Sequence, residues 1–158
     1  MKKNIDIQVI GELKSENGLF AIQVNKKYID GLTNIDGFQH LQIVWWGHLY
    51  DDNKNRASLV TDKPYKKGPE KIGVFATRSE MRPNPILIST IQVISIDKEN
   101  GIIYTPYIDA EVGTNILDIK PYHGTERIKE HRTPDWCSHW PKWYEESGEF
   151  NWQDEFNF

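Results

Sequence analysis

The chain has 158 residues, 38% of them hydrophobic and 27% charged, with a formal net charge of −4 at pH 7. These values are typical of a globular domain with a substantial core and exclude a disordered or collagen-like chain. No apolar run reaches the roughly 20 residues that a membrane helix needs, and the N-terminal residues lack the apolar core of a signal peptide. A single cysteine, Cys137, excludes an internal disulfide framework. We therefore expect a cytoplasmic protein without membrane partners.

Hydrophobic residues recur mostly with a period of two, which is typical of half-buried strands. The predicted strands cover residues 5–9, 19–24, 41–46, 86–96, 102–108 and 116–119. Asn100-Gly101 predicts a hairpin between the fourth and fifth of them. No βαβ alternation and no long amphipathic helix precedes residue 130. The predicted fold class is therefore mainly β, a small single-sheet antiparallel β-barrel with short C-terminal helices.

The C-terminal segment has a different pattern. Trp136, Trp140 and Trp143 recur at spacings of four and three, which is typical of short helices. Such a stripe predicts a face packed on the barrel, and a platform for stacking bases is the alternative. We expect two parts: a barrel domain over 1–130, and a Trp-rich, acidic tail over 131–158 packed on it.

The charge is unevenly distributed. Residues 145–158 carry five acids and no base, whereas residues 54–82 carry eight bases and three acids. A basic stretch of this kind fits phosphate or another anion, although a solvated lysine-rich loop is the simpler interpretation. The pI near 5.7 argues against a protein that holds nucleic acid by charge alone.

General catalytic motifs are weak. His123, His131 and His139 are spaced by eight residues, which does not match metal-ligand spacing on a helix or strand. No phosphate-binding loop and no nucleophile elbow is present. The sequence thus predicts no metal site.

Two segments are distinctive. Residues 73–86 contain Pro83 and Pro85, which push Arg82 and Asn84 into extended conformations and hold this arginine-containing loop rigid.

In the second segment, 112–122, Asp118 and Lys120 lie on the same side of a strand. Pro121 ends that strand, and Tyr122 follows. A structural ion pair between Asp118 and Lys120 is the simpler interpretation of these two charges.

Together these segments resemble the TsaA-like family, whose best-known members are the TrmO-type tRNA methyltransferases. The matching residues are Gly73-Val-Phe-Ala-Thr-Arg-Ser, Arg82-Pro-Asn-Pro-Ile, and Gly113-Thr followed by Asp118-Ile-Lys-Pro-Tyr. The resemblance covers roughly residues 8–125. It implies a β-barrel homodimer that binds S-adenosylmethionine and methylates the threonylcarbamoyl-modified adenosine beside the anticodon of tRNA.

The resemblance also implies a set of site residues. The cofactor-binding positions are His48, Leu49, Arg78, Ile88, Tyr107, Ile108 and Asp109. By chemistry, Arg78 suits the cofactor's carboxylate, Asp109 its ribose diol and Tyr107 its sulfonium.

The remaining implied residues concern the acceptor. Lys120 and Tyr122 are the candidates for catalysis, and Arg82, Asn84 and Asp118 are candidates for substrate binding.

The sequence departs from the family pattern in two places that bear on function. Ser15–Gly18 is a short turn in place of a loop that contains Pro-Arg-Gln in tRNA-acting members, and Leu87 replaces a glycine. Three alternatives therefore stay open beside the tRNA methyltransferase. These are a methyltransferase for a small-molecule acceptor, a non-catalytic nucleotide-binding module, and another enzyme acting on the sulfonium, such as a lyase.

Overall fold

The computed structural model describes residues 5–158, and the chain divides into two compact units. The first unit comprises the chain up to Asp51 together with Asn84–Arg127, and the second comprises Asp52–Pro83 together with Ile128–Phe158. The basic stretch thus groups with the C-terminal segment in the second unit. The expected domain division at residue 130 stays a prediction.

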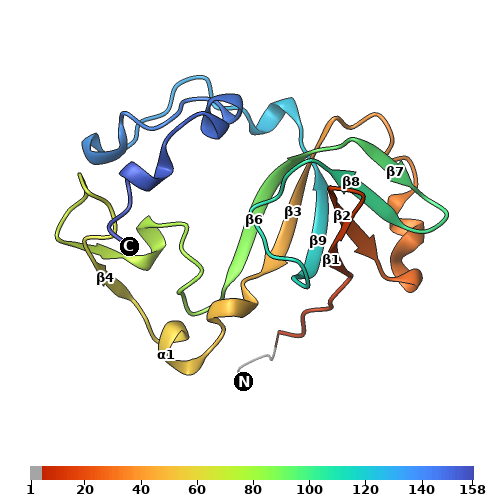
Figure 1. Cartoon of the computed structure of the whole chain (residues 1–158), viewed down its shortest axis with the longest axis horizontal. Coiled ribbons are helices and arrows are strands. Elements are labelled where there is room, and N and C mark those ends of the chain that lie inside the picture. Colours follow the sequence, from red (N-terminus) through yellow and green to blue (C-terminus); the bar gives the residue numbers. More distant parts are fainter. Residues whose placement is uncertain (1–4) are drawn as a thin grey trace. The chain divides into compact units, whose positions relative to one another are not determined.

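The first unit is built around one antiparallel sheet of seven strands, in the order β6-β3-β9-β1-β2-β8-β7 (Figure 1). Its strands are β1 (Gly11–Glu16), β2 (Leu19–Val24), β3 (His40–Trp46), β6 (Ile86–Gln92), β7 (Ser95–Asp97), β8 (Ile102–Thr105) and β9 (Asn115–Pro121). The predicted class, mainly β with antiparallel pairing, is confirmed. No described helix is both long and apolar enough to cross a membrane.

The first predicted strand, over residues 5–9, is wrong. Those residues form no strand, and β1 begins at Gly11 instead. Ile5 is 86% exposed, whereas Leu13 is fully buried against the core. The alternation in 5–9 therefore has no apolar surface to cover, and the burial of Leu13 determines which segment pairs with β2.

Glycines at positive φ shape two hairpins of the sheet. Asn17 and Gly18, at φ 50° and 79°, make the two-residue turn between β1 and β2, because only such left-handed residues match the twist of the paired strands. The predicted hairpin at Asn100-Gly101 is confirmed, as Gly101 (φ 68°) ends the turn from β7 to β8.

The single strand predicted over 86–96 is divided into β6 and β7, with Val93 and Ile94 between them. The Val93 N–H donates to the Gln39 carbonyl (2.9 Å), on the β3 side of the sheet, and the Ile94 N–H donates to the Tyr104 carbonyl (2.9 Å) on β8. The chain therefore changes its hydrogen-bonding partner between these two residues. This change of partner explains why one continuous apolar pattern gives two strands.

The core of the first unit lies on one face of its sheet. Because side chains alternate along a strand, Leu41, Ile43 and Trp45 of β3 point to this face, whereas the neighbours between them are half-buried. The fully buried residues around them are Leu13, Ile22, Ile91, Ile103 and Ile116.

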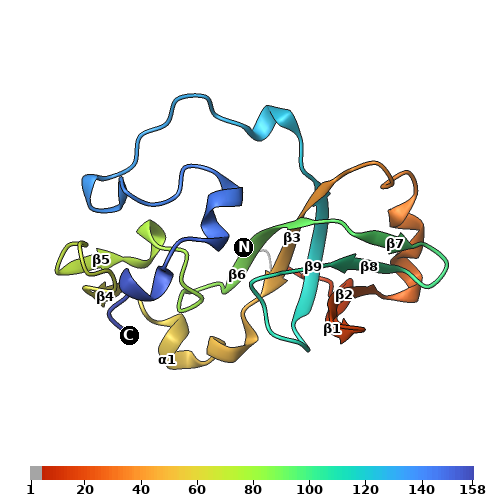
Figure 2. The same ribbon diagram turned by 45° about the horizontal axis from the view of Figure 1, so that its top comes forward.

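The second unit has little regular structure. It contains a two-stranded sheet of β4 (Val60–Asp62) and β5 (Lys71–Gly73) (Figure 2), which the sequence did not reveal because each strand has only three residues. The other short elements are the helix α1 (Asn53–Arg56) and the 3-10 helices η3 (Val74–Ala76), η5 (Asp135–Cys137), η6 (Tyr144–Gly148) and η7 (Trp152–Asp154).

The 3-10 helices of the first unit are η1 (Lys26–Leu32), η2 (His48–Tyr50) and η4 (Gly124–Glu126).

Aromatic side chains form the core of the second unit. Tyr65 stacks on Trp136 at 5.0 Å between ring centroids and meets Trp140 edge-on at 5.1 Å. Residues near the C-terminus add to this cluster, since Phe156 lies 5.8 Å from Tyr65. Trp143 is 59% exposed. Trp136 and Trp140 therefore pack in the core of the second unit, and packing of the tryptophan stripe on the barrel stays a prediction.

Candidate functional site

Several predicted site residues lie at one end of the sheet of the first unit. His48 and Leu49 follow β3 in η2, Asn84 precedes β6, and Thr114 precedes β9. Because β3 is antiparallel to both β6 and β9, the end of β3 lies beside the beginnings of the other two strands (Figure 1). The register fixes this arrangement, since Trp46 pairs with Ile86.

A buried hydroxyl contacts the imidazole at this end. Thr114 Oγ1 lies 3.4 Å from Nδ1 of His48, and Thr114 is only 1% exposed. Its backbone is held by β1, because the Leu13 N–H donates to the Thr114 carbonyl (2.9 Å) and the Gly113 N–H donates to the Leu13 carbonyl (2.7 Å). The imidazole itself is exposed. His48 is therefore held in place by the buried Thr114, while its side chain remains exposed to solvent.

The loop after β8 carries the predicted residues Tyr107 to Asp109. The hydroxyl of Thr105, which is fully buried, donates to the Tyr107 carbonyl at 3.0 Å. Ile108 is 2% exposed and packs in the core, whereas Tyr107 is 60% exposed and Asp109 is exposed. The buried Ile108 thus anchors this loop between two exposed side chains.

Ile88 and Asp118 lie on either side of Val44, because Val44 pairs with both across β6, β3 and β9. Ile88 is 47% exposed.

The carboxylate of Asp118 lies 2.7 Å from the ammonium of Lys120, so the ion pair that the simpler interpretation predicted is present. This hydrogen bond and the charge of Asp118 raise the pKa of Lys120. Lys120 is therefore a permanent cation at neutral pH and not a proton acceptor.

The structure does not bring Lys120 and Tyr122 to the end of the sheet where His48 lies. Lys120 pairs with Gln42, and the Tyr122 N–H donates to the His40 carbonyl at 3.1 Å, so both residues lie beside the beginning of β3. The four residue steps along β3 from Gln42 to Trp46 correspond to roughly 13 Å. Within one chain, these two candidates and the histidine thus lie toward opposite ends of the sheet.

Arg78 and Arg82 belong to the second unit, on the loop after η3. Arg82 Nη2 donates to the carbonyls of Val74 (3.2 Å) and Thr77 (3.5 Å). Through these two bonds the half-buried Arg82 braces the turn over residues 74–77. The buried Thr77 hydroxyl also donates to the Val74 carbonyl (2.9 Å) and accepts from the Ser79 N–H (3.3 Å). The exposed Arg78 therefore stands on a braced turn, and Arg82 supports it.

Part of the positive charge of the basic stretch is compensated within the second unit. Lys63 makes an ion pair with Glu70 at 2.8 Å, and Lys66 lies 4.0 Å from Asp154 of the acidic tail. Lys71 is exposed on β5. The stretch still offers cations to an anionic partner, although fewer than its composition suggests.

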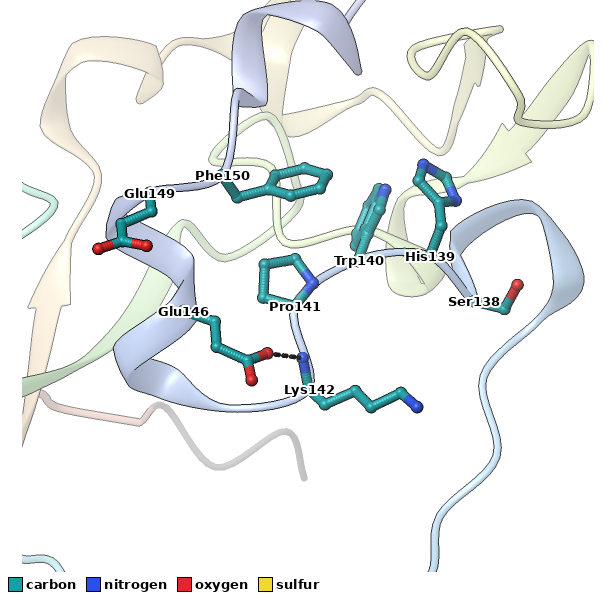
Figure 3. A pocket seen from close by; sticks show the side chains of 8 residues that line it. All are labelled: Ser138, His139, Trp140, Pro141, Lys142, Glu146, Glu149 and Phe150. Carbon is teal, nitrogen blue, oxygen red and sulfur yellow. Dashed lines mark hydrogen bonds between the residues drawn. The ribbon is translucent and has the colours of Figure 1, made fainter.

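The C-terminal segment contains a pocket of about 540 Å³ (Figure 3). Trp140, Pro141 and Phe150 supply its apolar wall, and Glu146 accepts a hydrogen bond from the Lys142 N–H at 3.0 Å. None of the predicted site residues lines this pocket. Among residues 5–158, no group of three or more His, Cys, Asp or Glu residues is arranged to hold a metal ion.

The sequence analysis missed the two buried threonines that support the site. Thr105 gave no signal, because a threonine in a strand is expected on packing grounds alone. Thr114 belongs to the Gly113-Thr motif, which by itself indicates no role for the hydroxyl. Both hydroxyls are buried and need partners, and only the fold shows which groups supply them.

The fold of this chain is shared with a known structure. The crystal structure of TrmO from Pseudomonas aeruginosa superimposes with a TM-score of 0.65 at 18% identity, covering 85% of this chain and 62% of that one. At this identity the likeness defines the fold. The family follows from the sequence: the family model of the tRNA-methyltransferase O N-terminal domain matches residues 5–126. The chain belongs to this family.

Two relatives illustrate what the chain is similar to. A protein of Archaeoglobus fulgidus named probable S-adenosyl-L-methionine-binding protein is 34% identical over 104 residues, which are 66% of this chain and 26% of that protein. The tRNA (adenine(37)-N6)-methyltransferase of Escherichia coli is 32% identical over 114 residues, which are 71% of this chain and 48% of that enzyme. The chain thus spans about a quarter and about half of these relatives.

Proposed function

We propose that this protein is an S-adenosylmethionine-dependent methyltransferase of the TrmO type. The observation that carries the proposal is the support given to the predicted cofactor residues of the first unit. His48 contacts the buried Thr114 hydroxyl, and Tyr107 is held by the buried Thr105 hydroxyl. Both relatives described above bear names that refer either to S-adenosylmethionine or to methyl transfer.

The chemistry of the available groups fits this cofactor. Arg78 is a permanent cation for its carboxylate, Asp109 is an acceptor for its ribose hydroxyls, and the exposed ring of Tyr107 offers an aromatic face to its sulfonium. His48, Leu49, Ile88 and Ile108 complete the proposed cofactor set. When bound, the cofactor supplies an activated methyl group, and the protein's contribution is to bind and orient the reactants for in-line transfer.

The proposed acceptor is the threonylcarbamoyl-modified adenosine of tRNA. The name of the Escherichia coli relative and the exposed cations of residues 54–82 support an RNA substrate. Lys120 and Tyr122 remain the proposed catalytic pair, although within one chain they lie toward the opposite end of the sheet from His48. Arg82, Asn84 and Asp118 are proposed to assist substrate binding. Because Lys120 stays protonated beside Asp118, its proposed part is to contact an anionic group of the acceptor.

A second candidate function is favoured by the turn between β1 and β2. This turn has only two residues, Asn17 and Gly18, where tRNA-acting members of the family carry a longer loop. The short turn fits a methyltransferase with a smaller acceptor. It also fits a module that binds the cofactor without transferring its methyl group. The Archaeoglobus relative is named for binding alone.

We further propose that the sheet closes into a barrel, that the protein forms a homodimer and that it acts in the cytoplasm. The change of hydrogen-bonding partner at Val93 and Ile94 supports closure. Val93 bonds to Gln39, next to β3, and Ile94 bonds to Tyr104 of β8, so one continuous segment connects strands near the two ends of the strand order. Exposed apolar residues on β6, such as Ile86 at 37% exposure, support self-association.

The test is transfer of a labelled methyl group from S-adenosylmethionine to tRNA. We expect incorporation into tRNA that carries threonylcarbamoyl-adenosine and none into the same tRNA lacking that modification. Incorporation into neither RNA, with the cofactor still bound, would favour the second candidate function. Absence of cofactor binding would contradict the proposal altogether.

A further inference from the structure

The side chain of Thr114 has an unusual environment for a hydroxyl. It is buried, and among residues 5–158 its Oγ1 contacts Nδ1 of His48 at 3.4 Å. The backbone groups of Thr114 have other partners, since its carbonyl accepts from the Leu13 N–H and its N–H donates to the Glu111 carbonyl (3.1 Å). The hydroxyl is therefore left to interact with the imidazole alone.

This environment decides which group donates the hydrogen bond. If Nδ1 carried the hydrogen, Thr114 Oγ1 would accept it, and the hydroxyl hydrogen would be buried without an acceptor. A buried donor left without an acceptor is strongly disfavoured, because it loses its hydrogen bond to water and gains none in return. The favourable arrangement has the hydroxyl donating to an unprotonated Nδ1, and a neutral imidazole then carries its hydrogen on Nε2.

We propose that Thr114 is a positioning residue, which selects, for the neutral His48 imidazole, the tautomer with its hydrogen on Nε2. Because the imidazole is exposed, this N–H becomes a hydrogen-bond donor directed away from the core. It suits an acceptor oxygen or ring nitrogen on a bound ligand and does not suit another donor. That the ligand is S-adenosylmethionine rests on the proposed function, whereas the tautomer does not depend on it.

The tautomer is measured by ¹⁵N NMR of the imidazole nitrogens in the ligand-free protein, with the His48 signals assigned by their loss in His48→Gln. At a pH high enough for the imidazole to be neutral, the wild type should show a hydrogen on Nε2 and an unprotonated, hydrogen-bonded Nδ1. Thr114→Ser should keep this pattern, because it retains the hydroxyl. Thr114→Val should give a mixture of tautomers, because its methyl group cannot donate.

A matched control separates this effect from a general loss of packing. Thr105→Val also removes a buried hydroxyl from the first unit, but that hydroxyl donates to Tyr107. It should leave the His48 tautomer unchanged. A wild-type His48 with its hydrogen on Nδ1, or a Thr114→Val protein with the wild-type pattern, would overturn the proposal.

The consequence for binding is measured by calorimetric titration with S-adenosylmethionine. Losing one oriented hydrogen bond of about 1 kcal/mol corresponds to roughly five- to tenfold weaker binding in Thr114→Val, with affinity restored in Thr114→Ser. If the tautomer changes as expected while the affinity does not, Thr114 positions His48 but His48 is no ligand contact. If the wild type binds no cofactor, the proposed function fails and the tautomer result stands.

Discussion

Arg82 donates through Nη2 to the carbonyl of Val74, 3.2 Å away, and thereby closes the turn that carries Arg78. The two arginines of this motif consequently have different parts. Arg82 is half-buried and satisfies backbone carbonyls, whereas Arg78 is exposed on the turn. This difference in environment gives Arg82 a structural role, and a ligand role for Arg78 remains our proposal.

Replacing Arg82 should therefore affect stability as well as binding. We expect Arg82→Met to lower the free energy of unfolding by about 1–2 kcal/mol, because it removes charge-assisted bonds to two carbonyls. Lys71→Met, an exposed cation in the same unit, is the control and should change it by less than about 0.5 kcal/mol. Urea unfolding followed by tryptophan fluorescence measures both. Equal stabilities in the two variants would show that Arg82 braces nothing.

Acid should weaken the second unit through Glu155. This buried carboxylate accepts hydrogen bonds from His139 Nε2 (2.8 Å) and Trp140 Nε1 (3.1 Å), of which the first contributes most to lowering its pKa from the ordinary value of 4.5. A lowered pKa in the folded state means that the stabilisation is complete above the unfolded-state value and disappears as the pH falls through the folded-state value.

The measurement is the urea midpoint of tryptophan fluorescence between pH 7 and pH 3. In the wild type the midpoint should decrease as the pH falls below about 4.5. Glu155→Gln should have a lower midpoint at pH 7, and its midpoint should decrease less as the pH falls. If the midpoint of this variant decreases as much as that of the wild type, the pH dependence comes from other carboxylates.

Gly11 should not tolerate a side chain. A Cβ at this position would lie 2.4 Å from the Gln23 carbonyl oxygen on β2, and that backbone atom cannot move without breaking the pairing of the strands. We expect Gly11→Ala to destabilise the protein by roughly 1–3 kcal/mol. Gly31→Ala is the matched control, since nothing lies within 4 Å of its Cβ position. Thermal unfolding checks both, and similar melting temperatures would refute the tight β1–β2 contact.

The basic stretch should matter only if the acceptor is RNA. Lys67→Glu combined with Lys71→Glu should raise the KM for tRNA several-fold and leave the affinity for S-adenosylmethionine unchanged, because it reverses exposed charges outside the proposed cofactor set. Lys26→Glu, an exposed residue of the first unit, serves as the control. A KM unaffected by the double reversal would remove the local support for RNA and favour a small acceptor.

The sequence allowed the sheet to be predicted wherever burial and turn chemistry agreed. β2 was predicted with its exact bounds because its apolar residues end at a polar turn, and Asn100-Gly101 located a hairpin. The period of residues 5–9 gave the wrong strand, since alternation does not reveal whether a partner surface exists. The strands β4 and β5 are too short to show any period.

The site was predictable only as a set of residues. Motif resemblance indicated His48 and Arg78, but the support of His48 depends on a contact between distant segments, and the side-chain bonds that hold the Arg78 turn follow no hydrophobic period. The Thr114–His48 contact spans 66 residues, and a period of two contains no information at that separation. The distance of Lys120 from His48 along the sheet follows from strand register, which the sequence of one strand alone does not determine.

The most direct test is calorimetric titration of the purified protein with S-adenosylmethionine and S-adenosylhomocysteine, with Arg78→Ala and Arg56→Ala in parallel. Both arginines carry the same charge in the second unit, but only Arg78 stands on the turn braced by Arg82. We predict micromolar binding in the wild type and in Arg56→Ala, and its loss in Arg78→Ala. No binding by the wild type, or equal binding by both variants, would contradict the proposed cofactor site.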